Sequence, residues 1–245
     1  SRWPRWSWSA SDGVGVLGGD MLELKGVERR FKSGKGIGPV SFCVRRGEVC
    51  SVVGPNGAGK STLFGILSMV SEEFTGSWSL DGRVGRQIPR GAIGYLPEST
   101  FLISSFTPRQ FCSFDASMRD VPHTAASIEE HLAAFVCKDF IDVPLGELSQ
   151  GMAKRVALAC AFLGEPRLVL LDEPLNAIDI QTTLILKDRI VSESERGCTL
   201  LISSHILDFL DEVSDRMLFL REGDIADDFD PRDGGAEGRY RELFL

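Results

Sequence analysis

Short apolar runs alternate with longer amphipathic segments through most of this chain. Stretches with the apolar character of strands are 21–27, 40–44, 48–53, 91–96, 168–171, 199–203 and 216–220. Stretches with apolar positions at helical spacing are 61–70, 151–163, 181–193 and 206–213. Strands that alternate with helices are typical of a mostly parallel sheet with helices on both faces. The pattern therefore predicts an α/β fold.

Three segments do not follow this alternation. Residues 1–20 hold tryptophans among Ser, Arg, Pro and Gly without any period, so we expect a disordered leader before a domain that spans 21–245. An aromatic anchor at a membrane surface or on a partner is the alternative. Residues 99–147 are polar, helix-leaning and interrupted by prolines, which indicates several helices. The tail from Asp224 is rich in Asp and Gly and weakly patterned.

The composition fits one globular domain and narrows its possible functions. Of the 245 residues, 43% are hydrophobic and 25% are charged. The formal net charge of -8 disfavours non-specific binding to nucleic acid, so we expect no nucleic-acid partner. The apolar runs fall well short of the roughly 18 residues that span a bilayer, so a membrane passage would require another chain. The six cysteines lack metal-site spacing, and we expect buried thiols.

A glycine-rich loop joins the run 48–53 to the helix that follows it. Gly54-Pro55-Asn56-Gly57-Ala58-Gly59-Lys60-Ser61-Thr62 fits the phosphate-loop pattern G-x-x-x-x-G-K-S/T. Its glycines let the backbone wrap around phosphate oxygens, and the helix N-terminus favours an anion. A turn that merely caps a helix would not place Lys60 where a positive charge is unfavourable without an anion. We expect nucleotide contacts from Gly54, Asn56, Gly57, Ala58, Gly59, Lys60, Ser61 and Thr62.

Two acids follow the apolar run 168–171. Burial of that run in the sheet would place Asp172 at the edge where ligands bind in open α/β sheets. Asp172 could then hold Mg²⁺, together with the Ser61 hydroxyl, while Glu173 polarises an attacking water. Two acids in a solvated turn are the alternative, which the phosphate loop makes the weaker interpretation. These motifs together predict a nucleoside triphosphatase.

A further motif lies directly before the helical stretch 151–163. Leu148-Ser149-Gln150-Gly151-Met152 resembles the LSGGQ signature of the ATP-binding subunits of ABC transporters, and Ser149 is placed to cap the next helix. The other similar segments are Tyr95–Glu98 (Q-loop), Asn176–Asp179 (D-loop), Ser203–His205 (switch histidine) and Phe31 (adenine-stacking aromatic). The resemblance covers about residues 21–225. Within the family, the chain is similar to the ATPases of ABC-2-type exporters.

The resemblance implies a P-loop NTPase fold. This fold has a mostly parallel central sheet, an N-terminal antiparallel β region and an α-helical subdomain inserted at about 99–165. It implies ATP and Mg²⁺ as cofactors, with catalysis by Glu173, His205 and Lys60. Metal binding would fall to Ser61, Glu98 and Asp172. Beyond the phosphate loop, nucleotide contacts would come from Phe31, Ser149, Gly151 and Asp179.

The resemblance also implies partners. ATP would drive dimerisation with an identical or paralogous ATPase subunit, and a separate transmembrane permease would carry the cargo, with export expected. The chain would then lie on the cytoplasmic face of a membrane. A permease could dock near 98–114, although the core of the helical subdomain explains the apolar residues there equally well. Those residues are Phe101, Leu102, Ile103, Phe106 and Phe111.

Three positions depart from the family pattern. Gln150 and Met152 alter the signature, and Glu98 replaces the Q-loop glutamine with an extra carboxylate near the metal. They are either marks of a subfamily or signs of a sluggish site. The alternative functions are a non-transport ABC ATPase serving Fe–S assembly, ribosomes or DNA, and a non-hydrolysing regulatory module. The absence of a long insertion or basic face weighs against the first, and the intact catalytic residues weigh against the second.

Overall fold

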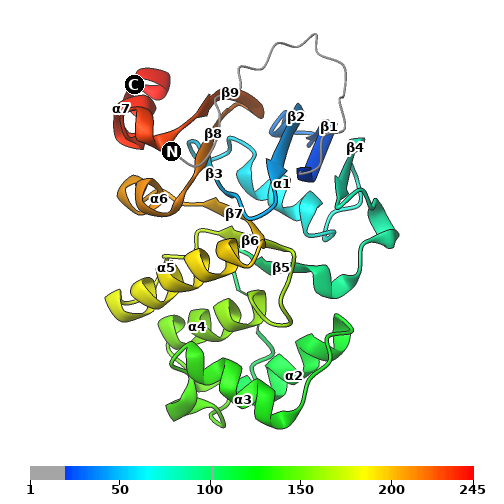
Figure 1. Ribbon diagram of the computed structural model, residues 1–245, viewed down its shortest axis with the longest axis vertical. Helices are drawn as coiled ribbons and strands as arrows, with labels where there is room; N and C mark the ends of the chain where they lie inside the picture. Colours follow the sequence, from blue (N-terminus) through cyan, green and yellow to red (C-terminus); the bar gives the residue numbers. More distant parts are fainter. Residues whose placement is uncertain (1–19, 101) are drawn as a thin grey trace.

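The computed structural model describes residues 20–100 and 102–245, which contain two β-sheets (Figure 1). The smaller sheet is antiparallel, with the order β2 (Gly36–Arg45), β1 (Asp20–Arg30), β4 (Thr75–Leu80). The larger sheet has the order β5 (Ile93–Leu96), β6 (Leu168–Asp172), β7 (Thr199–Ser203), β3 (Val49–Val53), β8 (Arg216–Arg221), β9 (Asp224–Phe229). Its neighbouring strands are parallel except that β9 is antiparallel to β8. The predicted fold class is confirmed.

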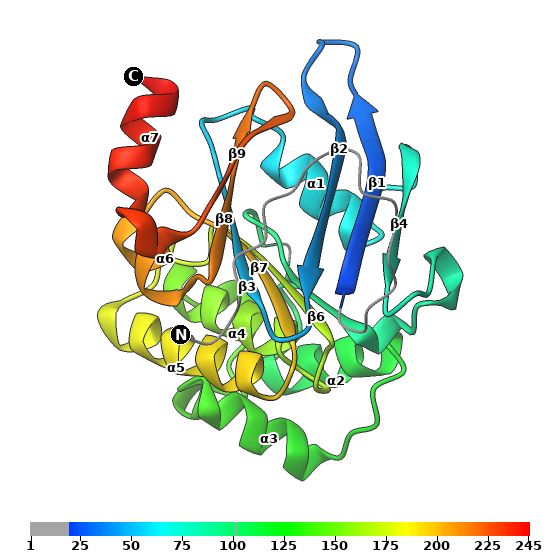
Figure 2. The same cartoon turned by 45° about the horizontal axis from the view of Figure 1, so that its top comes forward.

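Helices cover the larger sheet and form a layer of their own. They are α1 (Lys60–Leu67), α2 (Pro108–Met118), α3 (Ala125–Ala134), α4 (Gln150–Ala161), α5 (Ile180–Glu195), α6 (Leu207–Val213) and α7 (Ala236–Phe244). Helix α1 lies beside the small sheet (Figures 1 and 2). Helices α2, α3 and α4 lie together at the opposite end of the molecule and are called the helical layer below. Among the described residues, no helix combines the length and apolarity that a membrane crossing requires.

The central strands separate two hydrophobic cores. Side chains of a strand alternate between the two faces of its sheet. In β6, Val169 and Leu171 pack in the core shared with the helical layer, while Leu168 and Leu170 pack in the core around α1. Strands β3, β7 and β8 divide their side chains in the same way. The helical layer therefore packs on one face of the larger sheet, and α1 packs on the opposite face.

Three elements were not predicted from the sequence. Strand β4 buries little besides Trp78 and Leu80, so it lacks an apolar run. Strand β9 carries three aspartates at the sheet edge, and Asp228 pairs with Arg216 at 2.5 Å. The N-cap residue of α7 is Gly235, which has no side chain, and Asp211 of α6 accepts the Ala236 N–H at 2.9 Å instead. The tail from Asp224 therefore contains a strand and a helix that its weak sequence pattern did not indicate.

Local chemistry also moves several predicted boundaries. Pro108 does not break a helix but opens α2, where Thr107 and Gln110 form a capping box. Helix α1 ends at Leu67, before Met69 adopts a φ of 61°. The expected leader lies outside the described residues except for Asp20, which is the first residue of β1. Cys50, Cys112, Cys137, Cys160 and Cys198 are buried thiols, as predicted, whereas Cys43 is only half-buried.

Candidate functional site

The chemistry-bearing motifs follow adjacent parallel strands. Strands β6, β7 and β3 are neighbours, and they end at Asp172, Ser203 and Val53. Parallel strands present their carboxyl ends at one edge of a sheet. The phosphate loop, the acidic pair and the switch histidine therefore meet at this edge. Strand β5, beside β6, ends two residues before Glu98.

The phosphate loop is shaped by close backbone contacts. Gly59 is the N-cap of α1 with φ 107°, and no side chain caps that helix. An added Cβ on Gly59 would lie 2.4 Å from the carbonyl oxygen of Gly36. A Cβ on Gly54 would lie 2.4 Å from the carbonyl oxygen of Leu220. Glycine is therefore required at both positions, and the first amides of α1 are left available for an anion.

Lys60 is buried at the base of this loop. Its Nζ donates to the carbonyl oxygens of Gly54 at 2.7 Å and Pro55 at 3.3 Å. Burial lowers the pKa of Lys60, while Glu173 and Asp172 act in the opposite direction. Next along α1, Ser61 is exposed, as are Asn56 and Gly57 of the loop, whereas Ala58 is buried and Thr62 half-buried. The loop thus combines the buried ammonium of Lys60 with the exposed Ser61 hydroxyl and with exposed residues at Asn56 and Gly57.

Asp172 and Glu173 occupy different environments although they are adjacent. Asp172 is 1% exposed, and its Oδ1 accepts a hydrogen bond from the Ser203 hydroxyl. Glu173 has a φ of 49°, and its N–H donates to the Ser203 carbonyl at 3.1 Å. This left-handed backbone turns Glu173 out of the strand direction. Ser203 therefore fixes both acids, a second role for the switch segment that the sequence did not predict.

Glu173 and His205 form the centre of the site. The His205 N–H donates to Glu173 Oε2 at 3.3 Å, and His205 Nε2 lies 3.1 Å from Glu173 Oε1. The second contact lacks hydrogen-bond geometry, so the buried Oε1 has no hydrogen-bond donor among the described residues. Burial raises the pKa of Glu173, opposed by His205 and Lys60. A buried carboxylate oxygen without a donor is placed to accept a proton or a water hydrogen bond.

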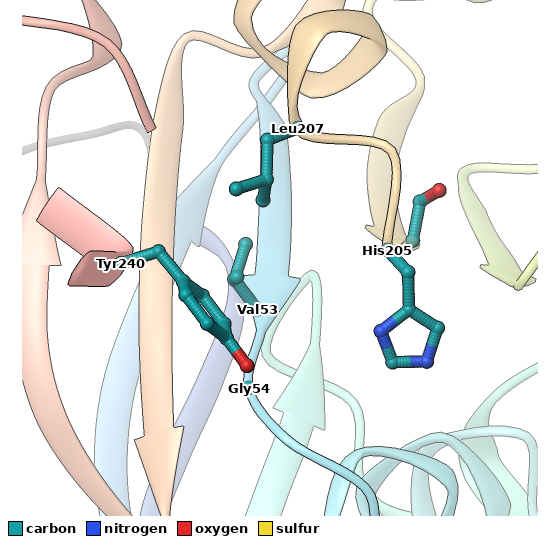
Figure 3. A pocket seen from close by; sticks show the side chains of 6 residues that line it. Val53, Gly54, His205, Leu207 and Tyr240 are labelled. Carbon is teal, nitrogen blue, oxygen red and sulfur yellow. The ribbon is translucent and has the colours of Figure 1, made fainter. Parts of the chain in front are cut away.

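A cavity of about 220 Å³ lies next to the switch histidine (Figure 3). Val53 and Gly54 line it from the start of the phosphate loop, and His205 and Leu207 from the switch segment. Tyr240 of α7 lies across the cavity from His205. No sequence signal pointed to Tyr240, because the tail that carries it shows no motif.

A second lysine approaches the acidic pair from the helical layer. Lys154 of α4 is 4% exposed, and its Nζ donates to the Glu98 carbonyl oxygen at 3.4 Å. Burial lowers the pKa of Lys154, while Asp172, Glu98 and Glu173 act to raise it. The side chain of Glu98 is exposed. Lys154 therefore adds positive charge near the acids, which no motif suggested.

The signature segment lies in a different part of the fold. Ser149 caps α4, as predicted, by accepting the Met152 N–H at 3.3 Å. A Cβ on Gly151 would lie 2.7 Å from the Ala177 carbonyl oxygen. The close contact with the D-loop therefore requires glycine at position 151 of the signature segment. Helix α4 lies with α2 and α3, away from α1 (Figures 1 and 2). Within the described residues, no hydrogen bond or ion pair joins Ser149 to Lys60.

Asp179 acts as a structural residue within this chain. It caps α5 by accepting the Thr182 N–H at 2.8 Å, and it pairs with Arg155 of α4 at 2.5 Å. Hydrogen bonds from Thr182 lower the pKa of Asp179. The D-loop is thereby tied to the signature helix, and any contact between Asp179 and nucleotide stays a prediction.

Phe31 presents its ring at the end of β1. Its side chain is 44% exposed, and the Arg29 guanidinium lies 4.7 Å from the ring centroid. One face of the ring is thus covered by a cation, a favourable arrangement. The ring position is compatible with base stacking, which stays a prediction.

The apolar residues proposed for docking have several placements. Leu102, Phe106 and Phe111 pack against the helical core, whereas Ile103 is 39% exposed. Phe101 lies outside the described residues. Most of this cluster therefore belongs to the core of the helical layer, and Ile103 and Phe114 remain exposed on it.

The donor chemistry suits Mg²⁺ without forming a complete cage. Within residues 20–100 and 102–245, no three His, Cys, Asp or Glu side chains gather closely enough to hold a metal. The predicted ligands, Ser61, Asp172 and Glu98, all offer hard oxygen atoms, which Mg²⁺ prefers. Mg²⁺ is commonly held by one or two carboxylates plus substrate phosphates. The residues therefore fit a metal that is completed by a nucleotide.

Comparisons with known proteins place these features in context. Residues 37–176 match the family described as ABC transporter. The SkfA peptide export ATP-binding protein SkfE of Bacillus subtilis is 27% identical over 216 residues, covering 85% of this chain and 88% of that protein. The Nod factor export ATP-binding protein I of Burkholderia lata is 31% identical over 207 residues, covering 82% of this chain and 68% of that protein.

Solved structures agree with this assignment. The structure of an ATP binding subunit of an ABC transporter matches with a TM-score of 0.83 and 26% identity, covering 92% of this chain and 100% of that one. A dimeric ATP-binding cassette bound to ADP and Pi matches with a TM-score of 0.76 and 22% identity, covering 86% of this chain and 98% of that one. The second match supports the fold alone.

Proposed function

This chain belongs to the ABC transporter family, and on that premise we propose that it is an ATP-hydrolysing subunit that powers export through a separate membrane permease. The observation that carries the proposal is the arrangement around Glu173. Its buried Oε1 lacks a hydrogen-bond donor within the described residues, beside His205 and near the buried Lys60. An arrangement of this kind suits proton abstraction next to a phosphate-binding loop.

The chain's own residues divide the work of hydrolysis. Lys60 and the first amides of α1 would compensate the charge of the terminal phosphates. Glu173 would accept a proton from the attacking water, and His205 would orient that water through its contact with the carboxylate. Bound Mg²⁺ would neutralise phosphate charge, held by Ser61 and Asp172 with Glu98 nearby.

We further propose that two ATPase subunits close around ATP. Helix α1, which begins at Lys60, and helix α4, which begins after Ser149, lie apart in the fold, so a single copy would not bring both residues to one triphosphate (Figures 1 and 2). A second copy or a paralogue would supply its α4 terminus to the other subunit's phosphate loop, with Gly151 and Asp179 beside the contact.

The transport role rests on the names of the relatives, two of which are export ATP-binding proteins. The permease would bind the helical layer where Ile103 and Phe114 are exposed. The chain would then work at the cytoplasmic face of a membrane. The cargo would be selected by the permease, whose chemistry this chain does not specify.

A glutamine at position 173 tests the proposed chemistry. In Glu173→Gln the general base is removed while shape and burial are kept, so MgATP turnover should fall by about 10²- to 10⁴-fold. MgATP binding should stay within about threefold, and dimers should accumulate with ATP, because hydrolysis no longer separates them. Phosphate release, calorimetric affinity and light scattering measure these three quantities.

Glu130, an exposed glutamate of α3, provides the matched control. Glu130→Gln makes the same chemical change away from the site and should alter none of the three quantities. Undiminished turnover in Glu173→Gln would remove Glu173 from the role of base. The lack of any magnesium-dependent binding of ATP by the unsubstituted protein would overturn the proposed function as a whole.

A further inference from the structure

The turn between β1 and β2 lies against the phosphate loop. Within the turn, the Phe31 N–H donates to the Lys35 carbonyl and the Gly34 N–H donates to the Phe31 carbonyl, both at 2.8 Å. Gly36, the next residue, has the carbonyl oxygen that a Cβ on Gly59 would meet at 2.4 Å. The turn and the loop therefore form one packed unit, although strands β2 and β3 separate them in the sequence.

The side chain of Lys35 extends over the exposed part of that loop. A Cβ on Gly57 would lie 3.9 Å from each of Cδ, Cε and Nζ of Lys35. Gly57 has a φ of 83° and is exposed. The end of the lysine side chain thus runs alongside the outer surface of the phosphate loop, whereas Lys60 is buried at its base.

The ammonium of Lys35 is not committed to another contact. It has no hydrogen bond or ion pair with any residue in 20–100 or 102–245. The arginines of the preceding strand are engaged instead. Arg29 lies over the Phe31 ring and reaches Glu73 at 3.5 Å, and Arg30 donates to the carbonyl oxygens of Glu222 and Gly38. Lys35 is therefore a cation available to a ligand in the loop.

We propose that Lys35 is a second lysine for the phosphate chain of the nucleotide, delivered by the same turn that presents Phe31. This inference rests on the proposed function and adds a binding residue to it. The two side chains lie at the two ends of one short hydrogen-bonded turn. The turn would then contact both the base, through Phe31, and the phosphates, through Lys35.

The contact predicts a moderate, salt-sensitive effect. A flexible, exposed ammonium gains less from an ion pair than a buried one, and salt screens it. Lys35→Ala should therefore weaken MgATP and MgADP binding by about three- to tenfold at low salt. The loss should shrink at high salt. Lys35→Arg should restore most of the affinity, and Lys35→Glu should weaken it further than Lys35→Ala.

Calorimetry with MgADP, and with MgATP in the Glu173→Gln background to prevent turnover, tests this proposal. Lys32 is the matched control, since it is exposed in the same turn and carries the same charge. Lys32→Ala should change affinity by less than about twofold. Circular dichroism and thermal unfolding should show that all variants fold alike, because both lysines are exposed.

The outcomes separate this proposal from the one before it. If Lys35→Ala and Lys32→Ala bind both nucleotides equally well, or lose affinity equally, the role of Lys35 is wrong while the nucleotide site stands. If Lys35→Arg fails to restore affinity, a charge contact is wrong. If the unsubstituted protein binds neither MgADP nor MgATP, the proposed function itself fails.

Discussion

The N-termini of α1 and α4 are built in opposite ways. Helix α1 begins after Gly59, has no side-chain cap, and carries Lys60 as its first residue. Helix α4 begins after Ser149, whose hydroxyl accepts the Met152 N–H. Free amide groups at a helix start need partners, and a lysine there is unfavourable without an anion. The first terminus therefore lacks a side-chain partner for its amides, whereas the second has one amide capped within the chain.

Under the proposed function, this difference would give the two termini different roles in binding one triphosphate. The α1 terminus has rigid surroundings, since Gly54 and Gly59 are packed against other backbone. It would supply most of the affinity of a single subunit. The α4 terminus is already capped and exposed, so it would add to binding when a second subunit closes. Substitutions at the two termini should consequently affect different steps.

The largest effect should follow from Lys60→Ala. Loss of a charged hydrogen-bond donor to phosphate should weaken MgATP binding by about ten- to hundredfold and abolish measurable turnover. Calorimetry on the monomer measures the binding. Lys60→Arg, which keeps the charge in a different shape, should bind better than the alanine variant. Equal affinity in the alanine variant and the unsubstituted protein would contradict the ligand-dependent interpretation of the α1 terminus.

A smaller and more selective effect should follow from Ser149→Ala. Removal of a helix cap costs about 1 kcal/mol of stability, and the same cost is expected for Thr124→Ala, which uncaps α3. Beyond this shared cost, Ser149→Ala should reduce ATP-driven dimerisation and turnover by about tenfold while the affinity of the monomer is unchanged. Light scattering measures dimerisation and phosphate release measures turnover, and both are compared between Ser149→Ala and Thr124→Ala.

An equal loss of dimerisation in both variants would assign it to stability alone. In that case Ser149 would be a cap like Thr124, and the proposed role of the α4 terminus in the second subunit's site would be wrong. The comparison is informative because both caps belong to the helical layer and both accept an N–H three residues ahead.

The sequence predicted the site motifs well, because each is a local pattern. The phosphate loop, Asp172, Glu173 and His205 follow strands that their apolar runs identify, and parallel pairing then brings them to one edge. The Ser149 cap could be predicted for the same reason. Their functional roles are still predictions, since geometry alone does not show chemistry.

The features that the sequence did not predict come from distant parts of the chain. Lys154 approaches the acids from α4, and Tyr240 reaches the cavity from the tail. Helix α7 begins where Asp211 of another helix accepts its N–H. Strand β9 has polar residues that pair with arginines of other elements. A window of neighbouring residues contains none of these partners, so periodicity could not indicate them.

The smallest effect concerns pH. Acidification should destabilise the helical layer before it destabilises α1. His131 of α3 donates from Nε2 to the Ala159 carbonyl of α4 at 2.7 Å. Burial lowers the pKa of His131 below its usual 6.5, opposed by the hydrogen bond to Ala159 and aided by Arg189 and Arg119. The unfolded chain then takes up this proton more readily than the folded one. The contribution of His131 to the free energy of unfolding should therefore be constant above about pH 6.5 and fall as the pH drops below it.

Urea unfolding at about pH 7.5 and about pH 5.5 measures this contribution. His131→Gln keeps a hydrogen-bond donor but cannot titrate, so the loss of stability on acidification should be smaller than in the unsubstituted protein. His123→Gln, in the loop before α3, should leave the loss unchanged. Because His131 contacts α4 and lies in the layer remote from α1, hydrogen exchange on acidification should rise in α3 and α4 before it rises in α1. The same rise in all three helices would mean that the layers do not respond independently, and the contrast between the two termini would then have to rest on ligand contacts alone.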